Sequence, residues 1–212
     1  MKAKQIALIL IPLNIILAYF VFNSIDSEVL FNREAKIRIS ENVQKLKDLR
    51  QVQTKYKQAK GTFADNFESL TYFLENDSIS IVKAIGEIPD TLTEEQALKL
   101  VDDKGEKIII RDTAYVLAKE TVFDAAYLES RNENFPLDLN NLTTVPHSNE
   151  VYNIDAGQVE KGKVIVQVFE ISTNYAAVFS GLDAENKSYE LDALLKVGSM
   201  SEASLNGNWK SE

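Results

Sequence analysis

The sequence predicts an α+β fold, in which an N-terminal transmembrane helix continues into a long amphipathic helix that packs on a mostly antiparallel sheet with short extra helices. Three observations support this prediction. Residues 6–22 carry no charged side chain, residues 24–60 contain neither Gly nor Pro, and short segments typical of strands and helices follow in irregular order after residue 61. Irregular mixing of the two is typical of α+β domains.

The length and composition are those of one folded unit of ordinary size. The chain has 212 residues, of which 45% are hydrophobic, and contains only 8 Gly and 4 Pro. Such a chain can bury one core. With no cysteine it has no disulfides, no thiolate metal site and no lipid-modified cysteine.

Charge is unevenly distributed along the chain. Residues 1–60 hold 11 Lys and Arg against 5 Asp and Glu, a net charge of +6, whereas the remainder holds 12 against 27, a net charge of -15. Nucleic-acid affinity depends on basic groups that neutralise phosphates, so we expect no nucleic-acid partner. The acidic part is expected to be a solvated surface.

The apolar run at residues 6–22 is predicted to be a membrane anchor, assigned to residues 6–23. Its 17 residues lie at the short end of what a bilayer requires. A cleaved signal peptide should end in small side chains, but this run ends in Ala-Tyr-Phe-Val-Phe. Pro12 and Asn14 lie within the span. The Asn14 amide is expected either to bond to another helix or to bond to its own backbone near Pro12.

The flanking charges indicate the direction of insertion. Lys2 and Lys4 mark residues 1–5 as cytoplasmic, whereas the later Arg33 and Lys36 oppose that assignment. Asp26 and Glu28 come first on the far side. We therefore expect a single-pass protein of the bacterial inner membrane with its soluble part in the periplasm.

Residues 24–61 are predicted to form an amphipathic stalk helix that is continuous with the anchor. Its apolar positions recur every three or four residues, which is the helical period. We expect this face to pack on the following domain rather than to form a coiled-coil seam. Its members are Ile39, Val43, Leu46, Leu49, Val52, Tyr56 and Ala59.

Gly61 is expected to end this helix, because glycine adopts the left-handed conformation at helix C-termini. Phe63 then belongs to a short extended link. Asp65 with Glu68 is predicted to form a capping box that opens a second helix containing Leu70.

The spacing of Tyr56, Gly61, Phe63 and Leu70, placed after a membrane span and an amphipathic helix, resembles the start of type IV pilins and type II secretion pseudopilins. The resemblance covers residues 1–75. It implies a helix packed on an antiparallel sheet and assembly through the membrane-proximal half. The Gly of the family's processing site and the Glu five residues into the mature helix are absent here. The resemblance therefore implies a pilin-like shape in a static membrane component.

Residues 62–198 are assigned to the α+β domain and residues 199–212 to a loose tail. Strands are predicted around 78–88, 107–111, 114–118, 142–145, 151–155, 163–171 and 189–197, with short helices after residue 93, at 121–130 and at 175–180. The strand at 163–171 is apolar on both faces, so it is expected to be central in the sheet.

The sequence shows no arrangement of residues that predicts catalysis. His147 is the only histidine and lies in a Pro-His-Ser-Asn turn, so we expect an exposed loop residue. One His without Cys cannot provide a common zinc site. No phosphate-binding or dinucleotide-binding motif occurs. We expect neither a cofactor nor an enzyme.

The sequence favours a structural component that assembles through its anchor and stalk, in a secretion, pilus-like or motility apparatus of the cell envelope. Its expected partners are the lipid bilayer and either other proteins or further copies of itself. The alternative is an anchored periplasmic module that binds a ligand, peptidoglycan or a segment of a partner protein at a sheet edge.

Overall fold

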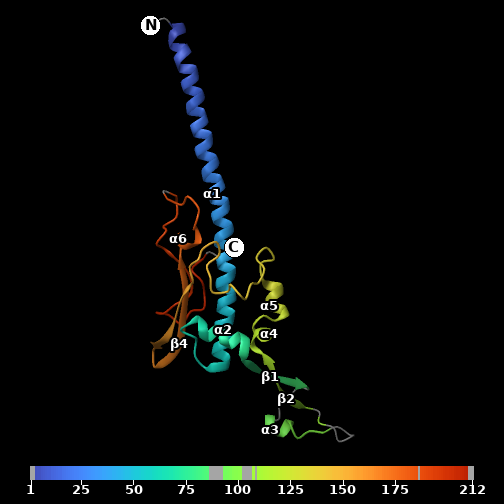
Figure 1. Cartoon of the computed structure of the whole chain (residues 1–212). Coiled ribbons are helices and arrows are strands. Elements are labelled where there is room, and N and C mark those ends of the chain that lie inside the picture. Colours follow the sequence, from blue (N-terminus) through green and yellow to red (C-terminus); the bar gives the residue numbers. More distant parts are fainter. Residues whose placement is uncertain (1–2, 86–92, 102–106, 108, 186, 210–212) are drawn as a thin grey trace.

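A computed structural model describes residues 3–85, 93–101, 107, 109–185 and 187–209. One helix, α1 (Ala3–Lys60), contains 58 residues and runs from the N-terminus into the centre of the folded body (Figure 1). Pro12 lies inside it without ending it. Gly61 ends α1 with a φ of 85°, and its N–H donates to Lys57 O at 2.8 Å. The anchor and the stalk are therefore one continuous helix.

Within the described residues, the remaining elements form two antiparallel sheets and five short helices. They are α2 (Phe67–Asn76), β1 (Ser78–Ile85), α3 (Glu94–Ala97), β2 (Ile110–Leu117), α4 (Ala118–Val122), α5 (Ala125–Ser130), β3 (Asn153–Lys161), β4 (Val164–Asn174), α6 (Tyr175–Val178) and β5 (Leu194–Gly198). One sheet pairs β1 with β2, and the other has the order β3-β4-β5. The predicted α+β architecture is confirmed.

The two sheets lie at different places along α1. The three-stranded sheet lies on one side of the helix, and α4 and α5 lie on the other, whereas the β1–β2 hairpin extends away from the body at the end far from the N-terminus (Figure 1). Strand β4 is central in its sheet, as expected. Its first residues, Val164 and Ile165, are exposed, whereas Phe169 and Ile171 are fully buried.

Several predicted boundaries differ from the structure. The strands expected at 107–111 and 114–118 are a single strand, β2, and the last strand begins at Leu194 rather than at residue 189. Around residues 142–145 there is only an isolated bridge between Thr144 and Val151. Residues 142–145 and 189–193 are apolar enough to resemble strands but lack continuous pairing, whereas β2 pairs with β1 along its whole length.

The core forms where α1 passes through the body. Leu46, Leu49 and Val52 are fully buried with side chains from α2 and β4, and Ile39, Val43 and Tyr56 pack against that cluster. Tyr56 meets Phe73 edge-on at 5.3 Å. Ala59, expected on the same face, is exposed, because the last turn of α1 extends past the core and Gln58 and Lys60 are exposed as well.

The helix after α1 begins one residue later than predicted. Asn66 is its N-cap, with extended backbone and a side-chain oxygen that accepts from Ser69 N at 2.8 Å. Asp65 instead accepts from the Asn66 side chain, and Glu68 is exposed, so the predicted capping box is wrong. Two adjacent residues suited to capping compete here, and the backbone conformation favours the second.

Phe63 and Leu70 connect this region to the core. Both are buried, and the Phe63 ring lies 4.7 Å from that of Phe169 on β4. The link after Gly61 thus holds the end of α1 against the three-stranded sheet.

The C-terminal segment, expected to be loose, partly extends this sheet. Gly207 forms an antiparallel bridge with Val197, and Asn208 N donates to Lys196 O at 3.1 Å. A Cβ on Gly198 would lie 2.2 Å from Phe169 O, so only glycine fits at this turn. Trp209 then packs against the core.

Candidate functional site: the membrane-proximal helix and its polar contacts

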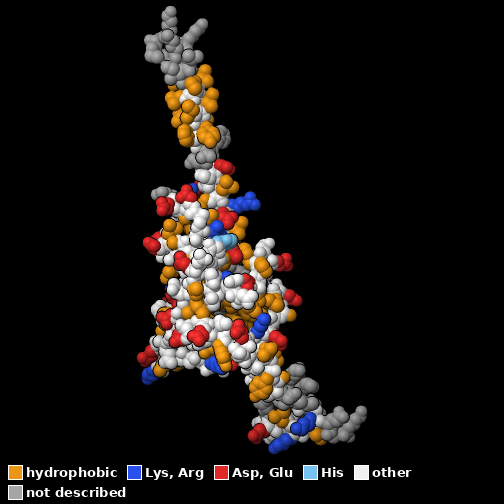
Figure 2. Space-filling view, in the orientation of Figure 1, with side chains coloured by type: hydrophobic (Ala, Val, Ile, Leu, Met, Phe, Trp, Pro, Cys, Tyr) orange, Lys and Arg blue, Asp and Glu red, His pale blue; other side chains and the backbone are white. Residues whose placement is uncertain are grey.

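The first part of α1 carries an apolar surface that the body does not cover. From Leu10 onward the helix includes an 18-residue window of mean hydropathy 1.4, and none of that window is buried. Figure 2 shows hydrophobic side chains around this part of the helix and charged ones over the body. The described part of the chain therefore contains one helix, near the N-terminus, that is long and apolar enough to cross a membrane.

Asn14 bonds to its own helix. Its Nδ2 donates to Leu10 O, four residues earlier, at 2.8 Å. The sequence allowed two arrangements, a bond to the backbone of the same helix or a bond to another helix, and the structure shows the first. An amide also carries an acceptor oxygen, so this bond does not use the full hydrogen-bonding capacity of Asn14.

The body first contacts α1 just beyond the apolar segment. Phe31 and Ala35 are buried, and Phe31 packs edge-on against Phe179 and Tyr189. Lys187 Nζ lies 2.7 Å from Glu28 Oε2, and this hydrogen bond lowers the pKa of the Glu28 carboxyl. The helix is thus fixed to the body within two turns of the apolar run.

Farther along, buried polar side chains of α1 bind segments that are distant in sequence. Gln53 exchanges two hydrogen bonds with the backbone of Ala64, one from its Nε2 at 2.7 Å and one to its Oε1 at 3.0 Å. Asn42 Oδ1 accepts from the Tyr152 hydroxyl at 2.6 Å. Because these polar atoms are desolvated, each requires its partner, and the contacts fix the position of α1 within the body.

Asp48 is the centre of the largest of these contacts. Arg131 binds its carboxylate with two hydrogen bonds, of 2.9 Å from Nε and 2.8 Å from Nη2. The Tyr127 hydroxyl donates to the same carboxylate at 2.9 Å and Gln44 Nε2 at 3.0 Å. The Asp48 hydrogen bonds raise the pKa of the Arg131 guanidinium, and burial raises that of the Tyr127 hydroxyl. With these raised pKa values, Arg131 stays charged and Tyr127 stays protonated, so both continue to donate to Asp48.

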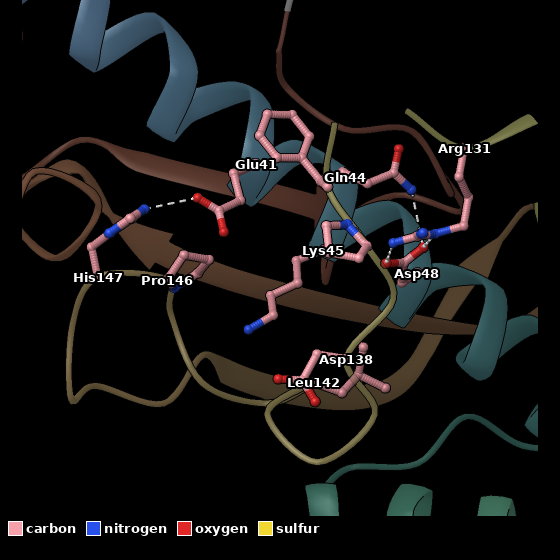
Figure 3. Close-up of a pocket in the computed structure, with 11 residues that line it drawn as sticks. Glu41, Gln44, Lys45, Asp48, Arg131, Asp138, Leu142, Pro146 and His147 are labelled. Carbon is pink, nitrogen blue, oxygen red and sulfur yellow. Dashed lines mark hydrogen bonds and ion pairs between the residues drawn. The ribbon is translucent and has the colours of Figure 1, made fainter. Parts of the chain in front are cut away.

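A cleft of about 250 Å³ lies between this part of α1 and the loop after α5 (Figure 3). At one end His147 Nε2 lies 2.9 Å from Glu41 Oε2; His147 is exposed, as expected, and has a φ of 61°. Lys45 extends into the cleft and donates to Thr144 O at 2.6 Å. Its desolvation lowers the pKa of the Lys45 ammonium group.

The charged groups around the cleft bind one another or the backbone. Asp138 at its far side accepts from the Asn141 side chain at 2.7 Å, which lowers the pKa of its carboxyl. Among the residues that the structure describes, no three His, Asp or Glu side chains converge as a metal site. The side chains around the cleft therefore form a polar contact between α1 and the loop after α5.

Together, the fold and the exposed helix define an α+β protein whose core is built around a helix able to cross a membrane. Comparisons with protein-family models, with curated proteins and with solved structures found no match.

Proposed function

We propose that this chain is a single-pass protein of the bacterial inner membrane that works as a structural and assembly component of a secretion, pilus-like or motility apparatus. It performs this role without catalysing a reaction. The observation that carries the proposal is the continuity of α1, which is exposed and apolar in its first part and forms the centre of the core in its second. Any contact made in the membrane would then act on the same unbroken helix that forms the core of the body.

The flanking charges support the orientation in this proposal. Lys2 and Lys4 precede the span and favour a cytoplasmic N-terminus. On the other side, Glu28 is bound by Lys187 of the body. The body then lies in the periplasm, directly at the membrane surface.

The pilin-like resemblance supports a similar shape. Tyr56 and Phe63 both contact the core, and α1 packs on an antiparallel sheet through its C-terminal half. In this proposal the chain uses that shape as a static membrane component, without the family's processing and without polymerisation that depends on the Glu five residues into the mature helix.

The test is affinity purification of the full-length protein from gently solubilised membranes, compared with the variant Asn14→Leu. A matched control is Asn149→Leu, which makes the same exchange on an exposed loop of the body. We expect stable partners or further copies with the wild type and the control, and their loss with Asn14→Leu. A monomer without partners in all three samples contradicts the proposal.

A second candidate is an anchored module that binds a protein segment, supported by the β1–β2 hairpin. This sheet has two strands among the described residues, and Tyr115 (76% exposed) and Leu117 lie on β2. An exposed sheet edge can accept an extended segment as an additional strand. If this candidate is correct, Tyr115→Ser removes the partner from the purified sample while Asn14→Leu does not.

A further inference from the structure

We propose that Met200 is an oxidation-sensitive contact that holds residues 199–205, here called the C-terminal loop, against the three-stranded sheet. Oxidation of its thioether to the sulfoxide releases the loop and uncovers an apolar strip on β4. The inference is independent of the proposed assembly function. The observation that carries it is the position of the Met200 side chain on Gly157, in a chain whose only other sulfur atom is in Met1.

Met200 lies on the face of the sheet that points away from the core. Its Cε lies 3.2 Å from the position that a Cβ on Gly157 would occupy. Gly157 is paired with Val168, and such cross-strand partners point to the same face of a sheet. The next pair, Ala156 with Phe169, packs in the core cluster around α1. Because neighbouring residues of a strand point to opposite faces, Gly157 and Val168 face outward.

The C-terminal loop covers part of this outward face. Val168 is only 2% exposed, although the core lies on the other side of the sheet. Residues two and four positions earlier on β4 share its face. Of these, Val166 is half-buried and Val164 is 62% exposed. The loop therefore shields β4 at Val168 and leaves the strand increasingly exposed toward its start.

Hydrogen bonds fix the C-terminal loop at its ends, and Met200 fixes it in between. Gly198 N donates to Asn206 O at 3.0 Å, and a hydrogen bond from α1 reaches Leu205 O at 3.3 Å. Among the described residues, no hydrogen bond joins residues 199–204 to β3 or β4. The contact of the Met200 side chain with the sheet therefore holds this part of the loop in place.

The Met200 thioether is open to two-electron oxidants, namely hydrogen peroxide or hypochlorous acid. A sulfur lone pair attacks the oxygen of the oxidant, and the O–O or O–Cl bond breaks. The sulfur, now oxidised by two electrons, keeps the oxygen as a sulfoxide, and water or chloride with a proton leaves. Met200 is half-buried, so an oxidant reaches it, and no thiol competes because the chain has no cysteine.

The sulfoxide weakens the contact between the loop and the sheet. A thioether suits the apolar surface at Gly157 and Val168, whereas a buried sulfoxide oxygen without a hydrogen-bond donor is unfavourable. The oxidised side chain therefore moves into water and the loop is released. Val168 and Val166 then join the exposed Val164 in one apolar strip, a surface to which another protein can bind. A methionine sulfoxide reductase reverses the change.

Limited proteolysis with a glutamate-specific protease tests the release, on the full-length protein in detergent. Cleavage after the exposed Glu202 reports on the loop, and cleavage after the exposed Glu133, in the loop after α5, reports on the rest of the body. Hydrogen peroxide should add one oxygen at Met200, measured by peptide mass, and raise cleavage after Glu202 at least about fivefold, with cleavage after Glu133 unchanged. Methionine sulfoxide reductase should reverse both changes. No oxidation at Met200, unchanged cleavage after Glu202, or an equal rise at both sites overturns the proposal.

Substitutions at Met200 separate its oxidation from other effects of peroxide. Met200→Leu keeps an apolar side chain without sulfur, so peroxide should no longer raise cleavage after Glu202. Met200→Gln places a polar group on the sheet and should raise this cleavage without any oxidant. The matched control is Leu205→Gln, which introduces the same amide at an exposed position of the same loop and should leave cleavage unchanged. A peroxide-dependent rise in Met200→Leu, or equal cleavage of the two Gln variants, contradicts the proposal.

Discussion

At the residue scale, Asp48 is the side chain that the body depends on most. Its carboxylate is almost fully buried and is held by Arg131, Tyr127 and Gln44. Asp48→Ala leaves the Arg131 charge without its partner, so we expect a loss of about 3–5 kcal/mol in the free energy of unfolding. Thermal and denaturant unfolding of the detergent-solubilised protein measures the change.

The matched control replaces both members of the ion pair. Asp48→Leu combined with Arg131→Met removes both charges together and should lose much less stability than Asp48→Ala. If the single and double variants are equally unstable, the packing of the site rather than the ion pair holds the loop.

Asp138 gives the loop beside the cleft a dependence on pH. The hydrogen bond from Asn141 lowers the pKa of the Asp138 carboxyl below its ordinary value of 3.8. A group whose pKa is lower in the folded state contributes stability above its unfolded pKa, and that contribution is lost as the pH falls through the folded pKa. We therefore expect the free energy of unfolding to fall less in the Asp138→Asn variant than in the wild type as the pH is lowered from about 5 to about 2. Unfolding midpoints of the wild type and of the Asp138→Asn variant, measured across that pH range, test the difference.

At the element scale, the C-terminal half of α1 is the central core element of the body. Leu49 is fully buried, so Leu49→Ala should lower the free energy of unfolding by about 2–5 kcal/mol. Ala59→Ser, on the exposed last turn of the same helix, should change it by less than about 0.5 kcal/mol. Unfolding curves of both variants measure these effects. Equal effects would mean that this half of α1 is a separate stalk.

The elements also show what the sequence could predict. The absence of Gly and Pro before Gly61 predicts the long helix, and the apolar character of both faces of residues 163–171 predicts the central strand. The buried polar contacts of α1 were not predictable in this way. Gln53 and Asp48 are polar side chains of the kind that usually lie on a solvated helix face. Their partners, Ala64 and Arg131, come close to them only in the folded chain. The one available signal was their position next to the apolar stripe.

The prediction of where α2 starts was wrong for a different reason. Asp65 and Asn66 both favour caps, and the sequence does not show which has extended backbone. The same holds for the tail, where pairing of Gly207 with Val197 depends on the turn at Gly198 rather than on strand propensity.

At the scale of the whole molecule, one helix joins the apolar segment to the body, so the assembly proposed for the membrane should depend on the continuity of this helix. Asp26→Pro removes a backbone hydrogen bond and introduces a ring that clashes with the preceding turn, between the apolar run and the first body contacts. We expect the body to unfold at the same midpoint as in the wild type, because Phe31 and the core lie beyond the kink. The amount of co-purified partners should decrease, whereas Asp26→Ala, which keeps the helix, should preserve it. Full recovery of partners with Asp26→Pro would show that the anchor only tethers the body, and the hairpin at the far end of the molecule would then become the preferred binding surface.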